Sequence, residues 1–181
     1  MIKSLYENEW LSLRQIVDPE KGISGYTYSH ETRCNGQVVA VLPYMRRRED
    51  GPPLAFLLRY EVCPAWGLEH LPCAITGGMD KPGKSPLYIA NLELAEEAGI
   101  HNVPPERWAP LGACRGTKST DTVYHLFAVD VTDLPEEKPQ GDGSRLEAEA
   151  YCRWDIDPTL SVDPLVPTMA MRLDQRLMFP G

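Results

Sequence analysis

This chain of 181 residues has fewer basic than acidic residues, no long apolar run and no closely spaced pair of cysteines. Each of these shortages excludes a class of protein. The 18 Lys and Arg residues are outnumbered by 26 Asp and Glu, and the net charge of -8 offers no footprint for sequence-independent nucleic-acid binding. No stretch reaches the roughly 20 apolar residues that a membrane span requires. We therefore expect neither nucleic acid nor a membrane as a partner.

The five cysteines are odd in number and widely spread, without the spacing of a zinc site. This distribution is typical of reduced thiols packed in the strands of a cytoplasmic protein. The first ten residues, MIKSLYENEW, carry charges where a signal peptide has an apolar core. We predict a soluble cytoplasmic protein.

The length corresponds to one domain with a sizeable core, preceded by an arm. Residues 4–33 alternate apolar and polar side chains around a turn at residues 18–22, which predicts an antiparallel hairpin. We divide the chain into this hairpin arm, residues 1–33, and a main domain, residues 34–181. In the main domain the patterns predict strands at 37–44, 54–61, 71–76, 108–114, 122–131 and 150–156, and a terminal helix that begins near Pro167.

Residues 77–100 are the stretch in which helix punctuation and clustered carboxylates coincide. Ser85 can cap a helix, Pro86 suits its first position, and Gly99 can adopt the left-handed conformation that ends it, so a helix should span residues 86–98. On this helix Glu93, Glu96 and Glu97 fall on one side, where unpaired like charges repel each other.

A hard divalent cation such as Mg2+ would relieve this repulsion, because it binds carboxylate and carbonyl oxygens. Gly77 and Gly78 allow the backbone to approach a ligand closely, and the helix start that follows favours anions. The pattern therefore indicates a metal site beside a phosphate site. The alternative is an ordinary amphipathic helix with an acidic, solvated face.

The same stretch resembles the motif of the Nudix hydrolases. That motif reads Gly, five residues, Glu, seven residues, then Arg-Glu-U-x-Glu-Glu-x-Gly-U, where U is aliphatic. It aligns without a gap on Gly78 and on residues 92–100, LELAEEAGI. Two positions differ from the family, because Lys84 stands in place of the first Glu and Leu92 in place of the Arg.

The resemblance implies an α/β fold, a Nudix-type α/β/α sandwich with a mixed sheet that follows the N-terminal β-hairpin. It implies hydrolysis of the pyrophosphate bond in a nucleoside diphosphate linked to another moiety, of the ADP-ribose or nucleotide-sugar type. Mg2+ or Mn2+ would be held by four residues, Gly78, Glu93, Glu96 and Glu97.

In the family the base is often a glutamate of a late loop, which here leaves Glu147 and Glu149 as catalytic candidates beside Glu93 and Glu97. A mobile solvated loop is the alternative for the late pair. Candidates for substrate contact are Arg59, Gly77, Ser119 and Asp121. For Arg59 the alternative is a surface salt bridge.

The arm resembles that of the ADP-ribose pyrophosphatase branch, where it builds a dimer contact and part of the nucleotide pocket. We therefore expect a homodimer; the alternative is an arm that packs only on its own core. Because Lys84 and Leu92 replace charged motif residues, a Nudix-fold binding or regulatory domain without turnover is the rival interpretation. An unrelated small α/β protein is the third.

Overall fold

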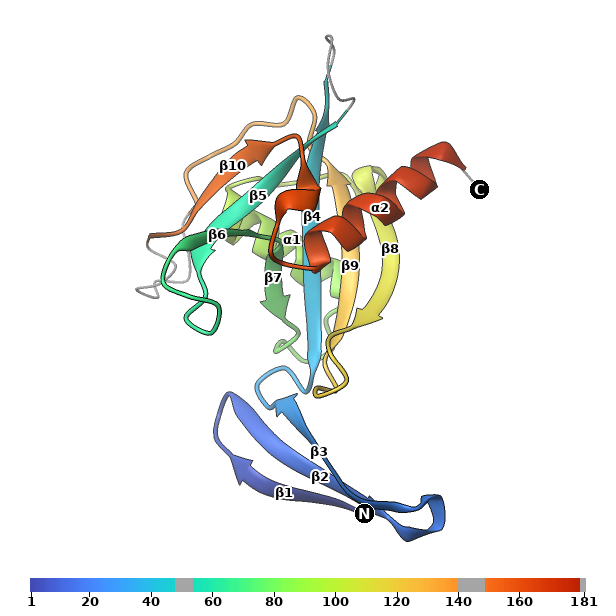
Figure 1. The fold of residues 1–181 in the computed structure, drawn as a ribbon. Helices are drawn as coiled ribbons and strands as arrows, with labels where there is room; N and C mark the ends of the chain where they lie inside the picture. Colours follow the sequence, from blue (N-terminus) through green and yellow to red (C-terminus); the bar gives the residue numbers. More distant parts are fainter. Residues whose placement is uncertain (48–53, 140–148, 180–181) are drawn as a thin grey trace.

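The computed structural model describes residues 1–47, 54–139 and 149–179. It consists of an α/β/α sandwich with a sheet arm beneath it (Figure 1). The arm contains three antiparallel strands, β1 (Ile2–Glu7), β2 (Leu11–Asp18) and β3 (Ile23–Glu31), in the order β1-β2-β3. The predicted hairpin is thus β2 and β3, joined by a short 3-10 turn, Pro19–Lys21, which Gly22 closes with a φ of 68°. A further strand extends it on one edge.

The main sheet is mixed and has seven strands. Its path is β10-β5-β4-β9-β8, with β6 added to β5 and β7 added to β4. β4 (Gln37–Arg46) runs parallel to β9 (Val123–Asp130) and antiparallel to the other strands that it meets. The remaining strands are β5 (Leu54–Val62), β8 (Trp108–Arg115) and β10 (Tyr151–Asp155).

The single strand predicted at residues 71–76 is two short strands, β6 (His70–Cys73) and β7 (Ile75–Gly78). The reason is that, among the described residues, β4 pairs with β5 between Tyr44 and Arg46, which leaves the rest of that edge open on each strand. β6 pairs with the free part of β5, and β7 pairs with Val38–Val41 of β4. β7 thereby delivers Gly77 and Gly78 beside the first residues of β4.

One helix covers each face of the sheet (Figure 1). α1 (Pro86–Ala98) buries Ile89, Ala90 and Leu94 in one apolar cluster, and α2 (Leu165–Met178) buries residues of the other. Because successive side chains of a buried strand point to opposite faces, β4 supplies Val39 and Val41 to the first cluster and Ala40 and Leu42 to the second.

α2 begins at Leu165, two residues before the predicted start. The buried Asp163 accepts hydrogen bonds from the Leu165 and Ala74 amides, both at 2.9 Å, and so fixes the first turn against the junction between β6 and β7. Pro167 lies inside that turn, where its missing N–H needs no partner. Met169 and Leu173 are fully buried, whereas Leu177, near the end of the helix, is 38% exposed.

Within the described ranges, neither helix combines the length and the apolar character needed to cross a bilayer. All five cysteines are free thiols.

Candidate active site

α1 has the bounds that its sequence predicts. The Ser85 hydroxyl accepts a hydrogen bond from the Tyr88 amide at 3.2 Å, and Gly99 ends the helix with a φ of 66° while its N–H donates to the Ala95 carbonyl. Both caps satisfy backbone groups that a helix end leaves unpaired. The helix packs against β7, so its glutamates stand above the glycines that β7 carries.

The structure brings five of the predicted site residues around one cavity of about 430 Å3. Gly77 and Gly78 come from β7, and Glu93, Glu96 and Glu97 from α1. Motif spacing predicted that these residues form one site. The packing of α1 on β7 brings them to one cavity.

Four further residues of the cavity wall were missed by sequence reasoning. Trp10, Glu31, Arg33 and Asp80 line the same cavity, the first three from the arm or its connection to β4. Arg33 stacks on Trp10 at 5.2 Å from the ring centre and lies 3.7 Å from an Asp80 oxygen. No local pattern marks Trp10, Glu31 and Arg33, because their place depends on how the arm meets the sandwich.

Gly77 is required by a close approach. A Cβ built on Gly77 would lie 2.0 Å from Glu93 Cδ, so any side chain at residue 77 would collide with the glutamate. At Gly78 the nearest atom to such a Cβ is Cys34 Cβ, at 3.0 Å. The two glycines therefore let the backbone run directly beneath the carboxylates.

The carboxylates of this cavity repel each other. The pKa of Glu93 is raised to about 7, chiefly by burial and then by the neighbouring charge of Glu96, whereas Lys81 and Arg33 act to lower it. Five carboxylates and two cationic side chains line the cavity, with Glu31 and Asp80 added to the motif glutamates and Arg33 and Lys81 opposing them. This excess of negative charge favours a bound cation.

The donor chemistry of the cavity fits Mg2+ or Mn2+, since both prefer carboxylate and carbonyl oxygens. Among the described residues, however, no three carboxylate, imidazole or thiol groups converge as ligands of one ion. Mutual repulsion keeps unpaired carboxylates apart, so a cation held by these glutamates would require their side chains to turn toward it. The Gly78 carbonyl accepts the Asp80 amide at 2.8 Å and keeps a second lone pair.

Arg59, predicted to contact substrate, is buried in β5 and is 3% exposed. Its Nε donates to a Glu61 oxygen at 2.9 Å, and its Nη1 lies 3.4 Å from Glu97 Oε2. The structure thus connects this arginine to the cavity through a motif glutamate.

Ser119 and Asp121 lie in the loop between β8 and β9, where they hold the arm. The Ser119 carbonyl accepts the Ser29 amide at 2.8 Å, and the Asp121 carboxylate contacts the His30 ring at 2.9 Å. Neither residue is among the described residues that line the cavity. Their predicted contact with substrate stays a prediction.

Of the two late-loop glutamates, Glu147 lies outside the described residues. The Glu149 carbonyl contacts His70 Nε2 at 3.1 Å, at the start of β6, and its side chain is exposed. His70 pairs with Val62 on β5, three residues after Arg59. The contact with His70 therefore places Glu149 toward the end of β5 that carries Arg59.

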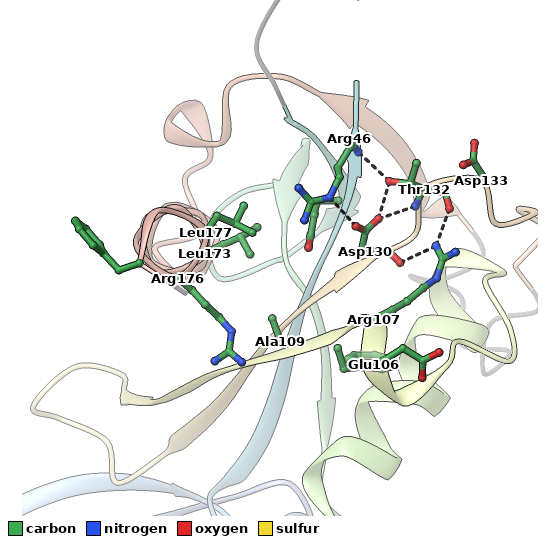
Figure 2. Close-up of a pocket in the computed structure, with 13 residues that line it drawn as sticks. Arg46, Glu106, Arg107, Ala109, Asp130, Thr132, Asp133, Leu173, Arg176 and Leu177 are labelled. Atoms are coloured by element: carbon green, nitrogen blue, oxygen red, sulfur yellow. Dashed lines mark hydrogen bonds and ion pairs between the residues drawn. The ribbon is translucent and has the colours of Figure 1, made fainter. Parts of the chain in front are cut away.

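A second cavity, of about 650 Å3, lies beside the opposite end of β4 (Figure 2). Arg46 donates to an Asp130 oxygen at 3.0 Å, and Arg107 Nη1 donates to the Thr132 carbonyl at 2.6 Å. These contacts fasten the end of β9 to its neighbours, so the arginines of this cavity have structural partners. We assign no ligand to it.

Of the comparisons with known proteins, the one with solved structures supports this fold. No protein-family model matches the sequence, and no curated protein matches it. Among solved structures, one described as the crystal structure of an ADP compounds hydrolase matches with a TM-score of 0.69 and 15% sequence identity. The match covers 100% of this chain and 94% of that chain, including the arm. The predicted Nudix-type sandwich with its N-terminal antiparallel sheet is thereby confirmed as the fold.

Proposed function

We propose that this protein is a Nudix pyrophosphohydrolase that cleaves a nucleoside diphosphate linked to another moiety, of the ADP-ribose or nucleotide-sugar type. The observation that carries the proposal is the convergence of Gly77, Gly78, Glu93, Glu96 and Glu97 on one acidic cavity. The structural likeness to an ADP compounds hydrolase supports the substrate class.

The cation would be Mg2+ or Mn2+, held by Glu93, Glu96, Glu97 and the Gly78 carbonyl. When bound, it would neutralise the diphosphate and lower the pKa of an attacking water. The cation and the substrate would enter together, because a cavity with this charge repels a free diphosphate.

The chain itself supplies orientation and a proton acceptor. Lys81 and Arg33 are the cationic side chains of the cavity wall and can pair with phosphate oxygens. A glutamate near the water would take its proton, with Glu93, Glu97, Glu147 and Glu149 as the candidates.

We further propose that the protein acts in the cytoplasm as a homodimer. Its five free thiols suit a reducing compartment, and large apolar side chains of the arm are exposed, among them Tyr6 at 58% and Leu13 at 40%. An exposed apolar face of this kind is typical of an interface.

A second function, nucleotide binding without turnover, is favoured by the two altered motif positions. Lys84 Nζ lies 4.5 Å from the centre of the Tyr88 ring, and Leu92 packs against the apolar cluster beneath α1. Neither side chain reproduces the charge that the family has at its position.

The two functions are separated by a hydrolysis screen. ADP-ribose, nucleotide sugars, dinucleotides and nucleoside triphosphates are incubated with Mg2+ or Mn2+, and the products are separated by chromatography. We expect metal-dependent cleavage of a linked diphosphate, and a loss of at least about a hundredfold in kcat for Glu97→Gln, which corresponds to about 2.7 kcal/mol. Binding of one of these compounds without cleavage under any metal would establish the binding domain instead.

A further inference from the structure

Arg59 is a cation placed inside the sheet. It lies in β5, where residues 54–60 are all buried, and is 3% exposed. A buried charge is costly unless it is paired and hydrogen-bonded. Burial acts to lower the pKa of the guanidinium, but the carboxylates of Glu97 and Glu61 offset this and raise it. The arginine is therefore held in place by two glutamates, one of them in the motif.

The residues that flank Arg59 in the sheet leave its guanidinium room to reach α1. In the sheet register it lies between Cys73 on β6 and Cys152 on β10. Burial raises the pKa of both thiols to about 12, so both are neutral at pH 7. Side chains at paired positions point to the same face, and two small neutral thiols leave the guanidinium room to reach Glu97 without competing for it.

The motif itself has lost this kind of contact. A guanidinium at residue 92 would hold a motif glutamate through charge-assisted hydrogen bonds, and the aliphatic Leu92 cannot donate any. Lys84, the other altered position, lies against Tyr88. A cation from outside the motif can take this role, and Arg59 Nη1 lies 3.4 Å from Glu97 Oε2.

We propose, on the basis of the proposed function, that Arg59 is a positioning residue that orients the Glu97 carboxylate for the divalent cation and replaces the brace absent at Leu92. Within the described part of the chain, Arg59 Nη2 is buried without a hydrogen-bond partner. The guanidinium therefore keeps a donor that would allow a two-point pair with the Glu97 carboxylate in the presence of a cation. This assigns Arg59 to orientation of a glutamate instead of contact with substrate.

The test measures Mn2+ affinity by calorimetry, without substrate, together with kcat, KM and the melting temperature. Arg59→Gln should weaken Mn2+ binding at least about tenfold and lower kcat, while KM changes by less than about threefold. Arg59→Lys keeps the charge but loses the planar fork, so it should show a smaller loss, of at least about threefold. The matched control is Arg46→Gln, which removes another ion pair of the same sheet, at 3.0 Å, and should leave Mn2+ affinity unchanged.

A double-mutant cycle with Glu97→Gln tests the partner. If Arg59 acts through Glu97, Arg59→Gln should cause no further loss of Mn2+ affinity once residue 97 is glutamine. Parent affinity and kcat in Arg59→Gln, with only a lower melting temperature, would show that the arginine merely stabilises the fold. Should Arg59→Gln fail to fold, Arg59→Lys with parent affinity and kcat would overturn the proposal equally. A parent protein that neither binds Mn2+ nor hydrolyses would instead refute the proposed function, and this inference with it.

Discussion

The carboxylate of Glu93 occupies the space in which a side chain at residue 77 would begin. A Cβ on Gly77 would lie 2.0 Å from both Cδ and Oε1 of Glu93, and 2.4 Å from its Cγ. The helix can bring its first motif glutamate this close to β7 only because residue 77 is glycine. The contact links the glycine pair and the glutamates physically as well as by spacing.

Gly77→Ala should therefore displace Glu93 without unfolding the protein, since the atoms that must move are the end of a flexible side chain. We expect Mn2+ affinity to fall at least about tenfold, or about 1.4 kcal/mol, in calorimetry. Gly25→Ala in the arm is the control, because its Cβ would meet only the flexible Gln15 side chain, at 3.1 Å. Equal Mn2+ affinity in both variants would mean that the cation does not depend on the position of Glu93.

The stability of the metal-free protein should depend on pH through Glu93. Its pKa is about 7 in the folded state and 4.5 as the ordinary value, so between these pH values the unfolded chain releases a proton that the folded protein keeps. Stability due to this group is then fully present below pH 4.5 and is lost as pH rises toward 7. In EDTA, the Glu93→Gln variant should not show this loss of stability. Its melting temperature should therefore increase relative to that of the parent as pH rises. A constant difference between the two proteins from pH 4.5 to 8 would contradict the raised pKa.

Mg2+ or Mn2+ should raise the melting temperature of the parent, because a cation that binds only the folded state stabilises it by mass action. The double variant Glu93→Gln, Glu97→Gln should lose this rise. The control double variant Glu20→Gln, Glu106→Gln removes two exposed glutamates that do not line the acidic cavity. It should keep the rise in melting temperature. The same rise in all three proteins would place the cation elsewhere.

The proposed dimer should depend on the apolar face of the arm. Light scattering should give about twice the chain mass of 20.3 kDa for the parent. Tyr6 and Leu13 are cross-strand neighbours, so Tyr6→Lys, Leu13→Lys places two charges side by side and should give monomers. Leu160→Lys, at a residue 75% exposed outside the arm, should remain dimeric. A monomeric parent at high concentration would exclude the dimer.

Features that depend on neighbouring residues could be predicted from the sequence. The bounds of α1 follow from Ser85, Pro86 and Gly99, because each acts on backbone groups within one helical turn. The other predicted strands of the main domain followed likewise from their apolar runs, whereas the strand predicted at residues 71–76 is two strands, β6 and β7. The start of α2 was misplaced by two residues, since it depends on a buried carboxylate, Asp163, that also bonds the distant Ala74 amide.

The sequence by itself determined the bounds of the motif helix and the spacing of its glutamates, because periodicity and caps are local properties of the chain, and the resemblance of the motif implied the layered fold. Only the tertiary structure decided what surrounds the motif. Strand register places Arg59 between two cysteines and opposite Glu97, and the docking of the arm brings Glu31 and Arg33 to the cavity. These contacts join segments that are far apart in the chain, and their partners are selected by sheet pairing and burial, which no single stretch of sequence encodes.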